Sequence, residues 1–277
     1  MMSSEIPKTN FAIIGGSSTL SINFPEDVDP EVKVIASDLI FQTPYGESPK
    51  FKLLEINAKK ILLCKMHGWR PGVPRRDASL QIFWVFYKAG VKSIIAEGGV
   101  GSINHLLKPR DLVIPNDYID HSMRKDVTLD LGYLSIMRNP VCPHTSKILY
   151  ETALKNTDAN VFSRGNYVVT DGKHFESVAE VHSFKLMSGD IIGQSMCPEV
   201  YLSREIGACY GRVDMVVNYA EGIICDWEHA ELKDIFYNES VRIGSIVLTT
   251  MIQLTQEVET SRCECKDLRK KTLLKID

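Results

Sequence analysis

The sequence has no long uncharged apolar run and no large excess of charge of either sign. No such run reaches the roughly 18 residues of a spanning helix, and the N-terminus lacks the basic start and apolar core of a signal peptide. We therefore expect a cytoplasmic protein without a membrane partner. The 32 basic and 35 acidic residues leave a net charge of −3, so nucleic acid is not expected as a partner either. Small molecules are the better expectation.

Cysteine pairs at the spacing of a zinc motif are also absent. The Cys-x-x-Cys spacing that is typical of structural zinc does not occur, so we predict no metal site. Buried thiols are the simplest interpretation of most cysteines. The alternative concerns Cys263 and Cys265, a C-x-C pair that could form a strained disulfide. The seven cysteines are residues 64, 142, 197, 209, 225, 263 and 265.

The length and the alternation of elements favour one α/β domain. The chain has 277 residues, of which 44% are apolar, and contains no internal repeat or clear linker. We expect a single domain over 1–277, with 1–9 and 262–277 as tails. Helices are predicted at 77–88, 145–154 and 232–255, and strands at 11–14, 61–64, 90–96 and 165–170. Alternating helices and strands place ligands at the strand ends of a sheet.

Three predicted strands are followed by segments rich in glycine and polar residues. The segments are Gly15-Gly16-Ser17-Ser18, Lys65-Met66-His67-Gly68 and Glu97-Gly98-Gly99. Small residues allow backbone N–H groups and hydroxyls to approach an anion closely. For the first segment, an ordinary turn after a strand is the alternative.

Three further motifs lie in the second half of the chain. They are Phe175-Glu176, the run Gln194-Ser195-Met196-Cys197-Pro198-Glu199-Val200, and Asn218 at the end of an apolar segment. Together with the glycine-rich segments, they resemble the signature of the purine nucleoside and methylthioadenosine phosphorylases, from Phe11 to about Gln256. The resemblance implies a mixed central sheet flanked by helices. It also implies a homotrimer or dimer of trimers that binds a purine nucleoside, with inorganic phosphate as co-substrate and no cofactor.

The resemblance implies a role for each motif. Phe175 would stack on the base, Glu199 would bind the ribose diol, and Gln194 and His229 would contact the sugar. The residues implied to bind phosphate are Ser17, Lys65, His67, Gly98, Gly99 and Ser195.

Two positions point to the base. A 6-oxopurine presents an N1–H donor and an O6 acceptor, which suit a carboxylate and an amide NH₂ respectively. Family members specific for 6-oxopurines pair Phe-Glu with Asn, whereas methylthioadenosine enzymes pair Phe-Ser with Asp. With Glu176 and Asn218, the chain resembles the former, and we predict a nucleoside of the inosine or guanosine type. Glu176, Asn218 and His67 are the predicted catalytic residues.

Two departures from the family pattern keep alternatives open. Met66 stands where the family has a phosphate-binding Arg, with Lys65 as a possible substitute, and Gln194 stands where it has a Met at the ribose. A lysine lacks the bidentate geometry that suits phosphate. One alternative is a methylthioadenosine or methylthioinosine phosphorylase. The other is a divergent nucleoside-binding protein or hydrolase with a weakened phosphate site.

Overall fold

The centre of the molecule is built from strands whose sequences are mostly apolar. In the computed structural model, which describes residues 5–257 and 263–273, β1 (Phe11–Ile14) pairs in parallel with β6 (Lys59–Cys64) and β7 (Ser93–Ser102). Strands that are buried on both faces have nearly continuous apolar sequences. The strands predicted at 11–14 and 61–64 are therefore confirmed.

The central sheet has eleven strands and is mixed in direction. Its main path runs β11-β8-β14-β7-β1-β6-β5-β2, and β12 pairs with β13 and β9 at one side, where β13 also pairs with β7. Two small sheets, β3 with β4 and β10 with β15, lie apart from it. The remaining strands of the central sheet are β2 (Lys33–Leu39), β5 (Phe51–Ile56), β8 (Leu112–Val113), β9 (Asp117–Asp120), β11 (Val161–Phe162), β12 (Asn166–Val169), β13 (Ile191–Gly193) and β14 (Cys209–Tyr219). The small sheets comprise β3 (Gln42–Thr43), β4 (Gly46–Glu47), β10 (Tyr133–Ser135) and β15 (Arg269–Lys271).

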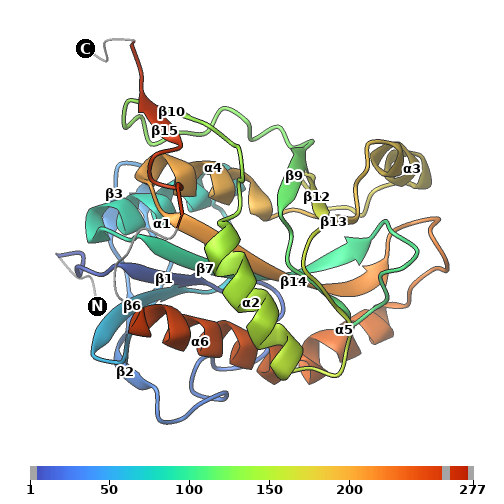
Figure 1. The fold of residues 1–277 in the computed structure, drawn as a ribbon, viewed down its shortest axis with the longest axis horizontal. Coiled ribbons are helices and arrows are strands. Elements are labelled where there is room, and N and C mark those ends of the chain that lie inside the picture. The colour runs from blue at the N-terminus through green and yellow to red at the C-terminus, as the bar shows by residue number, and fades with distance from the viewer. Residues whose placement is uncertain (1–4, 258–262, 274–277) are drawn as a thin grey trace.

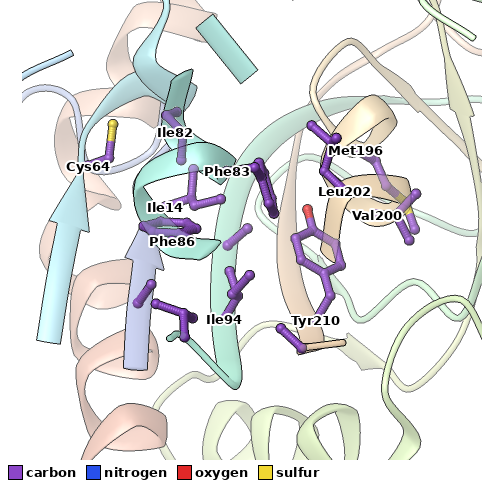
Figure 2. Close-up of a cluster of buried hydrophobic side chains, with 14 of the residues drawn as sticks. Ile14, Cys64, Ile82, Phe83, Phe86, Ile94, Met196, Val200, Leu202 and Tyr210 are labelled. Atoms are coloured by element: carbon purple, nitrogen blue, oxygen red, sulfur yellow. The ribbon is translucent and has the colours of Figure 1, made fainter. Parts of the chain in front are cut away.

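Helices cover both faces of the sheet (Figure 1). Ala12 and Ile14 of β1 belong to a core shared with α1 (Arg75–Ala89) and α4 (Met196–Ile206), where Phe83 and Phe86 lie near Ile14 (Figure 2). Successive strand residues point to opposite faces, so Ile13 packs in the second core with α2 and α6. The other helices are α2 (Pro143–Lys155), α3 (Val178–Leu186), α5 (His229–Asn238), α6 (Ser240–Gln256) and the 3₁₀ turn η1 (Met66–Gly68).

Two element boundaries differ from the sequence prediction. The segment 97–102, expected as a loop, continues β7, because its glycines are extended and pair with β14. The single helix expected at 232–255 is two helices, α5 and α6, which meet at Glu239. Helix α5 also begins earlier than predicted, at His229.

The predicted tails are only partly outside the fold. Residues 1–4, 258–262 and 274–277 lie outside the described residues, but β15 pairs with β10. Cys265 and Leu268 are buried, and Thr9 is buried at the other end of the chain. Residues 263–273, which lie in a predicted tail, are therefore attached to the fold through β15 and two buried side chains, while Lys266, Lys270 and Lys271 are exposed. In the described part of the chain, no helix combines the length and apolarity required to cross a membrane.

Candidate active site

A cavity of about 270 Å³ opens where β1, β6, β7 and β14 end. These strands are parallel neighbours, so their carboxyl ends meet at one edge of the sheet, the usual ligand position in α/β folds. Most of the residues predicted from the sequence line this cavity. They are Ser17, His67, Gly98, Gly99, Phe175, Glu176, Gln194, Ser195 and Asn218.

A buried glutamate that the sequence analysis did not single out organises the loop after β1. The Glu97 side chain is fully buried and accepts hydrogen bonds from the backbone N–H groups of Gly16, Ser18 and Thr19 and from the Thr19 hydroxyl. A Cβ at Gly16 would collide with the Glu97 carbonyl. Glycine is therefore required at this position, and Glu97 holds the loop with Ser17 facing the cavity.

Two hydroxyl groups are arranged to donate into the cavity. The Gly99 N–H donates to Ser17 Oγ at 3.0 Å, and Arg212 Nη2 donates to Ser195 Oγ at 3.1 Å. A hydroxyl that already accepts a hydrogen bond keeps its own hydrogen for another acceptor. Ser17 and Ser195 thus supply two donors for an anion.

The guanidinium behind Ser195 belongs to a fully buried ion pair. Arg212 and Asp214 are 0% exposed and joined at 2.5 Å and 2.7 Å. Burial raises the pKa of the Asp214 carboxyl, an effect that the Arg212 guanidinium opposes. A Cβ at Gly98 would lie 2.7 Å from Arg212 Nη2, so this glycine lets β7 pack over the pair.

A buried chain of hydrogen bonds through Glu199 and Tyr210, here called the relay, holds His67 at the cavity. Its Nδ1 lies 2.8 Å from Glu199 Oε1, and the Tyr210 hydroxyl donates to Glu199 Oε2 at 2.7 Å. Burial raises the pKa of Tyr210 well above its ordinary value, so the phenol stays protonated and can donate. Met66 and His67 have φ of 50° and 52°, a left-handed backbone that is uncommon for residues other than glycine. The surrounding contacts hold the strained turn and direct His67 inward.

The other end of the cavity combines a carboxylate, an amide and aromatic rings. Glu176 is buried and accepts from Thr170 Oγ1 at 2.5 Å. Asn218 Nδ2 donates to the carbonyl of Tyr219 at 2.7 Å, while Oδ1 is buried and has no partner within residues 5–257 and 263–273. Phe175 is 55% exposed, and its ring lies 4.6 Å from that of Trp227. These groups suit a flat heterocycle with polar edges.

Arg75 is a lining residue that sequence reasoning missed. Its guanidinium lies 3.9 Å from the centre of the Trp69 ring and donates to Gln194 Oε1 at 2.6 Å. The Trp69 ring in turn lies 5.2 Å from the ring of His67. Arg75 is the one lysine or arginine among the described residues that line the cavity, so it brings a positive charge to the cavity wall next to Trp69.

Three predicted site residues lie outside the lining. Lys65 donates to the Ile22 carbonyl at 2.6 Å, and burial lowers its pKa, so its geometry does not support the predicted phosphate contact. Both carboxylate oxygens of Glu199 are engaged by His67 and Tyr210, so Glu199 supports His67 instead of facing a ribose. His229 is exposed at the start of α5.

Comparison with known proteins places these features in a family. Residues 11–253 match the model of the phosphorylase superfamily. The chain is 32% identical over 271 residues to a 6-oxopurine nucleoside phosphorylase of Pyrococcus furiosus, covering 94% of this chain and 97% of the relative. It is 30% identical over 264 residues to an S-methyl-5′-thioadenosine phosphorylase of Pyrococcus horikoshii, covering 93% and 96%.

Solved structures share the fold. An adenosine/methylthioadenosine phosphorylase variant from Schistosoma mansoni matches with a TM-score of 0.80 at 21% identity, covering 94% of this chain and 97% of the other. A methylthioadenosine phosphorylase from an antarctic soil metagenomic library matches with a TM-score of 0.73 at 24% identity, covering 96% and 93%.

Proposed function

Because the chain belongs to the phosphorylase superfamily, we propose that it cleaves the N-glycosidic bond of a 6-oxopurine nucleoside with phosphate. The products are the free base and a pentose 1-phosphate. The choice of base rests on one observation: Glu176 and Asn218 line the same cavity. The similar 6-oxopurine nucleoside phosphorylase of Pyrococcus furiosus supports the same choice.

The two residues complement the edges of an inosine or guanosine base. The Glu176 carboxylate can accept the N1–H hydrogen, and the second hydrogen on Asn218 Nδ2 can be donated to O6. Asn218 Oδ1 is buried without a partner among the described residues, and a buried unpaired acceptor is costly. In this proposal Oδ1 accepts a hydrogen bond from N7 once N7 has taken up a proton from solvent.

The reaction requires charge stabilisation at both ends of the cavity. A phosphate oxygen forms a bond to C1′ while the C1′–N9 bond breaks, and its electron pair moves into the purine. Asn218 stabilises the resulting charge on the base, since preorganised donors act most strongly where charge develops. As the C1′–N9 bond breaks, the base takes up a proton from solvent at N7, so that the purine is released as the neutral free base.

Phosphate would lie against the hydroxyls of Ser17 and Ser195 and the ring of His67. We assign Gly99 a supporting role because its N–H orients Ser17. Arg75 would supply the positive charge that the sequence lacks at Met66. Inorganic phosphate is the co-substrate in this proposal, and the residues of the cavity perform the chemistry.

The ribose would lie between these two ends. Gln194 lines this part of the cavity, and Arg75 holds its amide oxygen, which leaves its NH₂ group for a sugar hydroxyl. Phe175 would cover the base by stacking. His229 lies one turn before Leu232 on α5, and Leu232 lines the cavity, so contact between His229 and the sugar stays a prediction.

A second candidate is cleavage of a nucleoside with an apolar 5′ substituent. The side of α5 that lines the cavity carries Leu232 and Phe236, which favour an apolar group such as a methylthio substituent. The similar S-methyl-5′-thioadenosine phosphorylase also motivates this alternative. It changes the substrate but not the bond that is broken.

Release of free base from four nucleosides tests the proposal. Inosine, guanosine, adenosine and methylthioadenosine are each incubated with the protein, with and without phosphate. We expect release of hypoxanthine and guanine that depends on phosphate. Faster release from methylthioadenosine would favour the second candidate, release without phosphate would indicate a hydrolase, and no release from any substrate would contradict the phosphorylase assignment.

A further inference from the structure

Four cysteines from three distant parts of the sequence meet outside the cavity. Cys142 caps the N-terminus of α2, Cys209 begins β14, and Cys263 and Cys265 lie in the C-terminal segment before β15. The sulfurs all lie within 4.8 Å of one another. Cys142 and Cys265 are buried, and the other two are half-buried.

The spacing of the sulfurs fits one metal ion. Zinc–thiolate bonds of about 2.3 Å in a tetrahedron separate the sulfurs by about 3.8 Å. Cys209 Sγ and Cys263 Sγ are 3.3 Å apart, and the four thiols are free in the structure. We propose that Cys142, Cys209, Cys263 and Cys265 form a structural zinc site in which all four protein ligands are thiolates.

The ligand set decides the class of the ion and its role. Four thiolates in a tetrahedron favour zinc over the hard cations magnesium and calcium, which take oxygen ligands. A site with four protein ligands has no open position for a substrate, as is typical of structural zinc. The ion therefore holds the fold and takes no part in the proposed reaction.

The ion would join the C-terminal segment to the sheet and to α2. This segment has other anchors: Arg204 Nη1 donates to the Cys265 carbonyl at 3.1 Å, and Arg269 Nη1 donates to the Glu205 carbonyl at 2.6 Å. A metal bond between residues that are far apart in sequence adds stability because the unfolded chain has no preformed site.

The site is also next to the relay that holds His67. Cys209 directly precedes Tyr210, whose hydroxyl donates to Glu199, and the Cys142 N–H donates to the Tyr210 carbonyl at 2.8 Å. Zinc at the four cysteines would thus fix the backbone of Tyr210 from both sides. The Tyr210 hydroxyl would in turn keep Glu199 in place against His67.

The sequence did not predict this site because the spacing is not that of a linear zinc motif. Cys142 and Cys209 are single cysteines, and the C-x-C pair alone suggested a disulfide. Only the fold brings them together. Oxidation of the same sulfurs to two disulfides would remove four electrons and four protons through an external oxidant, and it is the competing outcome of the test.

Metal analysis of the full chain tests the proposal. The protein is produced in zinc-supplemented medium, purified anaerobically without chelators, and measured by mass spectrometry of metals. We expect one zinc ion per chain, and its loss in Cys142→Ser and Cys263→Ser. Cys225→Ser is the matched control, since Cys225 is exposed and outside the cluster, and it should retain the ion. A protein without bound metal, whether its thiols are free or oxidised, would overturn the proposal.

A second measurement covers the case in which the variants fail to fold. Wild-type protein produced with cobalt in place of zinc should show the absorption of tetrahedral thiolate coordination, and a chelator should remove both the colour and part of the thermal stability. Absence of thiolate-to-cobalt bands would contradict the site. A denatured mass lower by two hydrogens for each disulfide would identify the oxidised alternative. Neither readout depends on enzymatic activity, so both are separate from the test of the proposed function.

Discussion

At the scale of single residues, the selectivity of the cavity rests on one buried polar atom that has no partner in the described part of the chain, in a lining whose other polar side chains are mostly hydrogen-bonded. Asn218 Oδ1 is buried without a partner among the described residues, whereas Glu97, Glu199 and Asp214 are each engaged by two or more donors. The engaged carboxylates hold the site together. Asn218 is free to read the base.

Replacing Asn218 by Asp should shift the base preference. A carboxylate cannot donate to O6 of a 6-oxopurine but can accept from a 6-amino group, and loss of one preorganised donor costs about 3 kcal/mol of barrier, roughly a hundredfold in rate. The ratio of kcat/KM for inosine to that for adenosine should therefore fall by at least about tenfold. Asn116→Asp is the control, because Asn116 Oδ1 accepts from Gly165 N–H and Asn116 does not line the cavity. An unchanged ratio in Asn218→Asp would reject the assignment.

Replacing Arg75 by Met should weaken phosphate binding. The guanidinium lies in a partly buried setting where attraction to an anion is stronger than in water, although burial lowers its pKa somewhat. We expect KM for phosphate to rise about tenfold, equivalent to about 1.4 kcal/mol. Arg76→Met is the matched control, since Arg76 is the exposed neighbour and should change KM for phosphate by less than about twofold. Equal effects of the two substitutions would place the phosphate away from Arg75.

At the scale of elements, a helix start positions the residues that face the base. Ser177 caps α3 and forms a capping box with Glu180, directly after Phe175 and Glu176. Phe175 is largely exposed, so its side chain adds little buried apolar contact that would hold this segment in place. The cap therefore contributes to the order of the base-binding loop.

Ser177→Ala should loosen this loop. Loss of an N-cap side chain costs about 1 kcal/mol of helix stability. Amide hydrogen exchange should become faster over the first turn of α3, and KM for the nucleoside should rise while KM for phosphate is unchanged. Ser183→Ala, an exposed position on the same helix, should change neither. Unaltered exchange in Ser177→Ala would contradict the capping argument.

The same cap should be sensitive to acid. Hydrogen bonds from the Ser177 N–H and hydroxyl lower the pKa of Glu180 below its ordinary value of 4.5. A carboxyl group with a lowered folded pKa stabilises the fold above its unfolded pKa and loses this contribution as the pH falls through the folded value. We therefore compare the amide hydrogen exchange rates of the first turn of α3 in wild type and Ser177→Ala, each corrected for the intrinsic exchange rate at that pH. The difference between the two proteins should become smaller below about pH 4.

At the scale of the whole molecule, the cavity is open and has apolar side chains near its mouth. Phe175 is 55% exposed and Met123 is 90% exposed, and the backbone of Met123 is held by Asp171, shortly before Phe175 in the chain. Exposed apolar side chains grouped near a site are typical of an interface. We propose that a second copy of the chain covers this region in a homotrimer or a dimer of trimers.

The mass in solution tests this assembly. With a chain of 31.2 kDa, light scattering should give three or six times that mass. Met123→Asp should lower the mass and raise KM for the nucleoside together, because a charge in an apolar interface is costly. Leu154→Asp, at an exposed apolar position near the end of α2 and outside the cavity lining, serves as a control of the added charge alone. A monomer in the wild type would reject the proposal.

The sequence alone determined the elements with a strong local signal and the order of the motifs. Apolar runs such as 11–14 and the pattern of α1 predict their structure because burial on one or both faces is encoded locally. The combination of Glu176 and Asn218 could also be predicted from the sequence, because the family resemblance assigns each of the two positions to a motif. These features require no knowledge of long-range contacts.

Only the tertiary structure decided how charges and thiols are paired. Lys65 turned away from the cavity and Glu199 turned toward His67, because the partner of a polar side chain depends on which strands become neighbours. Arg75 was missed because its guanidinium reaches the cavity across Trp69 from a different element. The four cysteines likewise meet only when α2, β14 and the C-terminal segment pack together. Sequence spacing records none of these distances, whereas the sheet topology sets all of them.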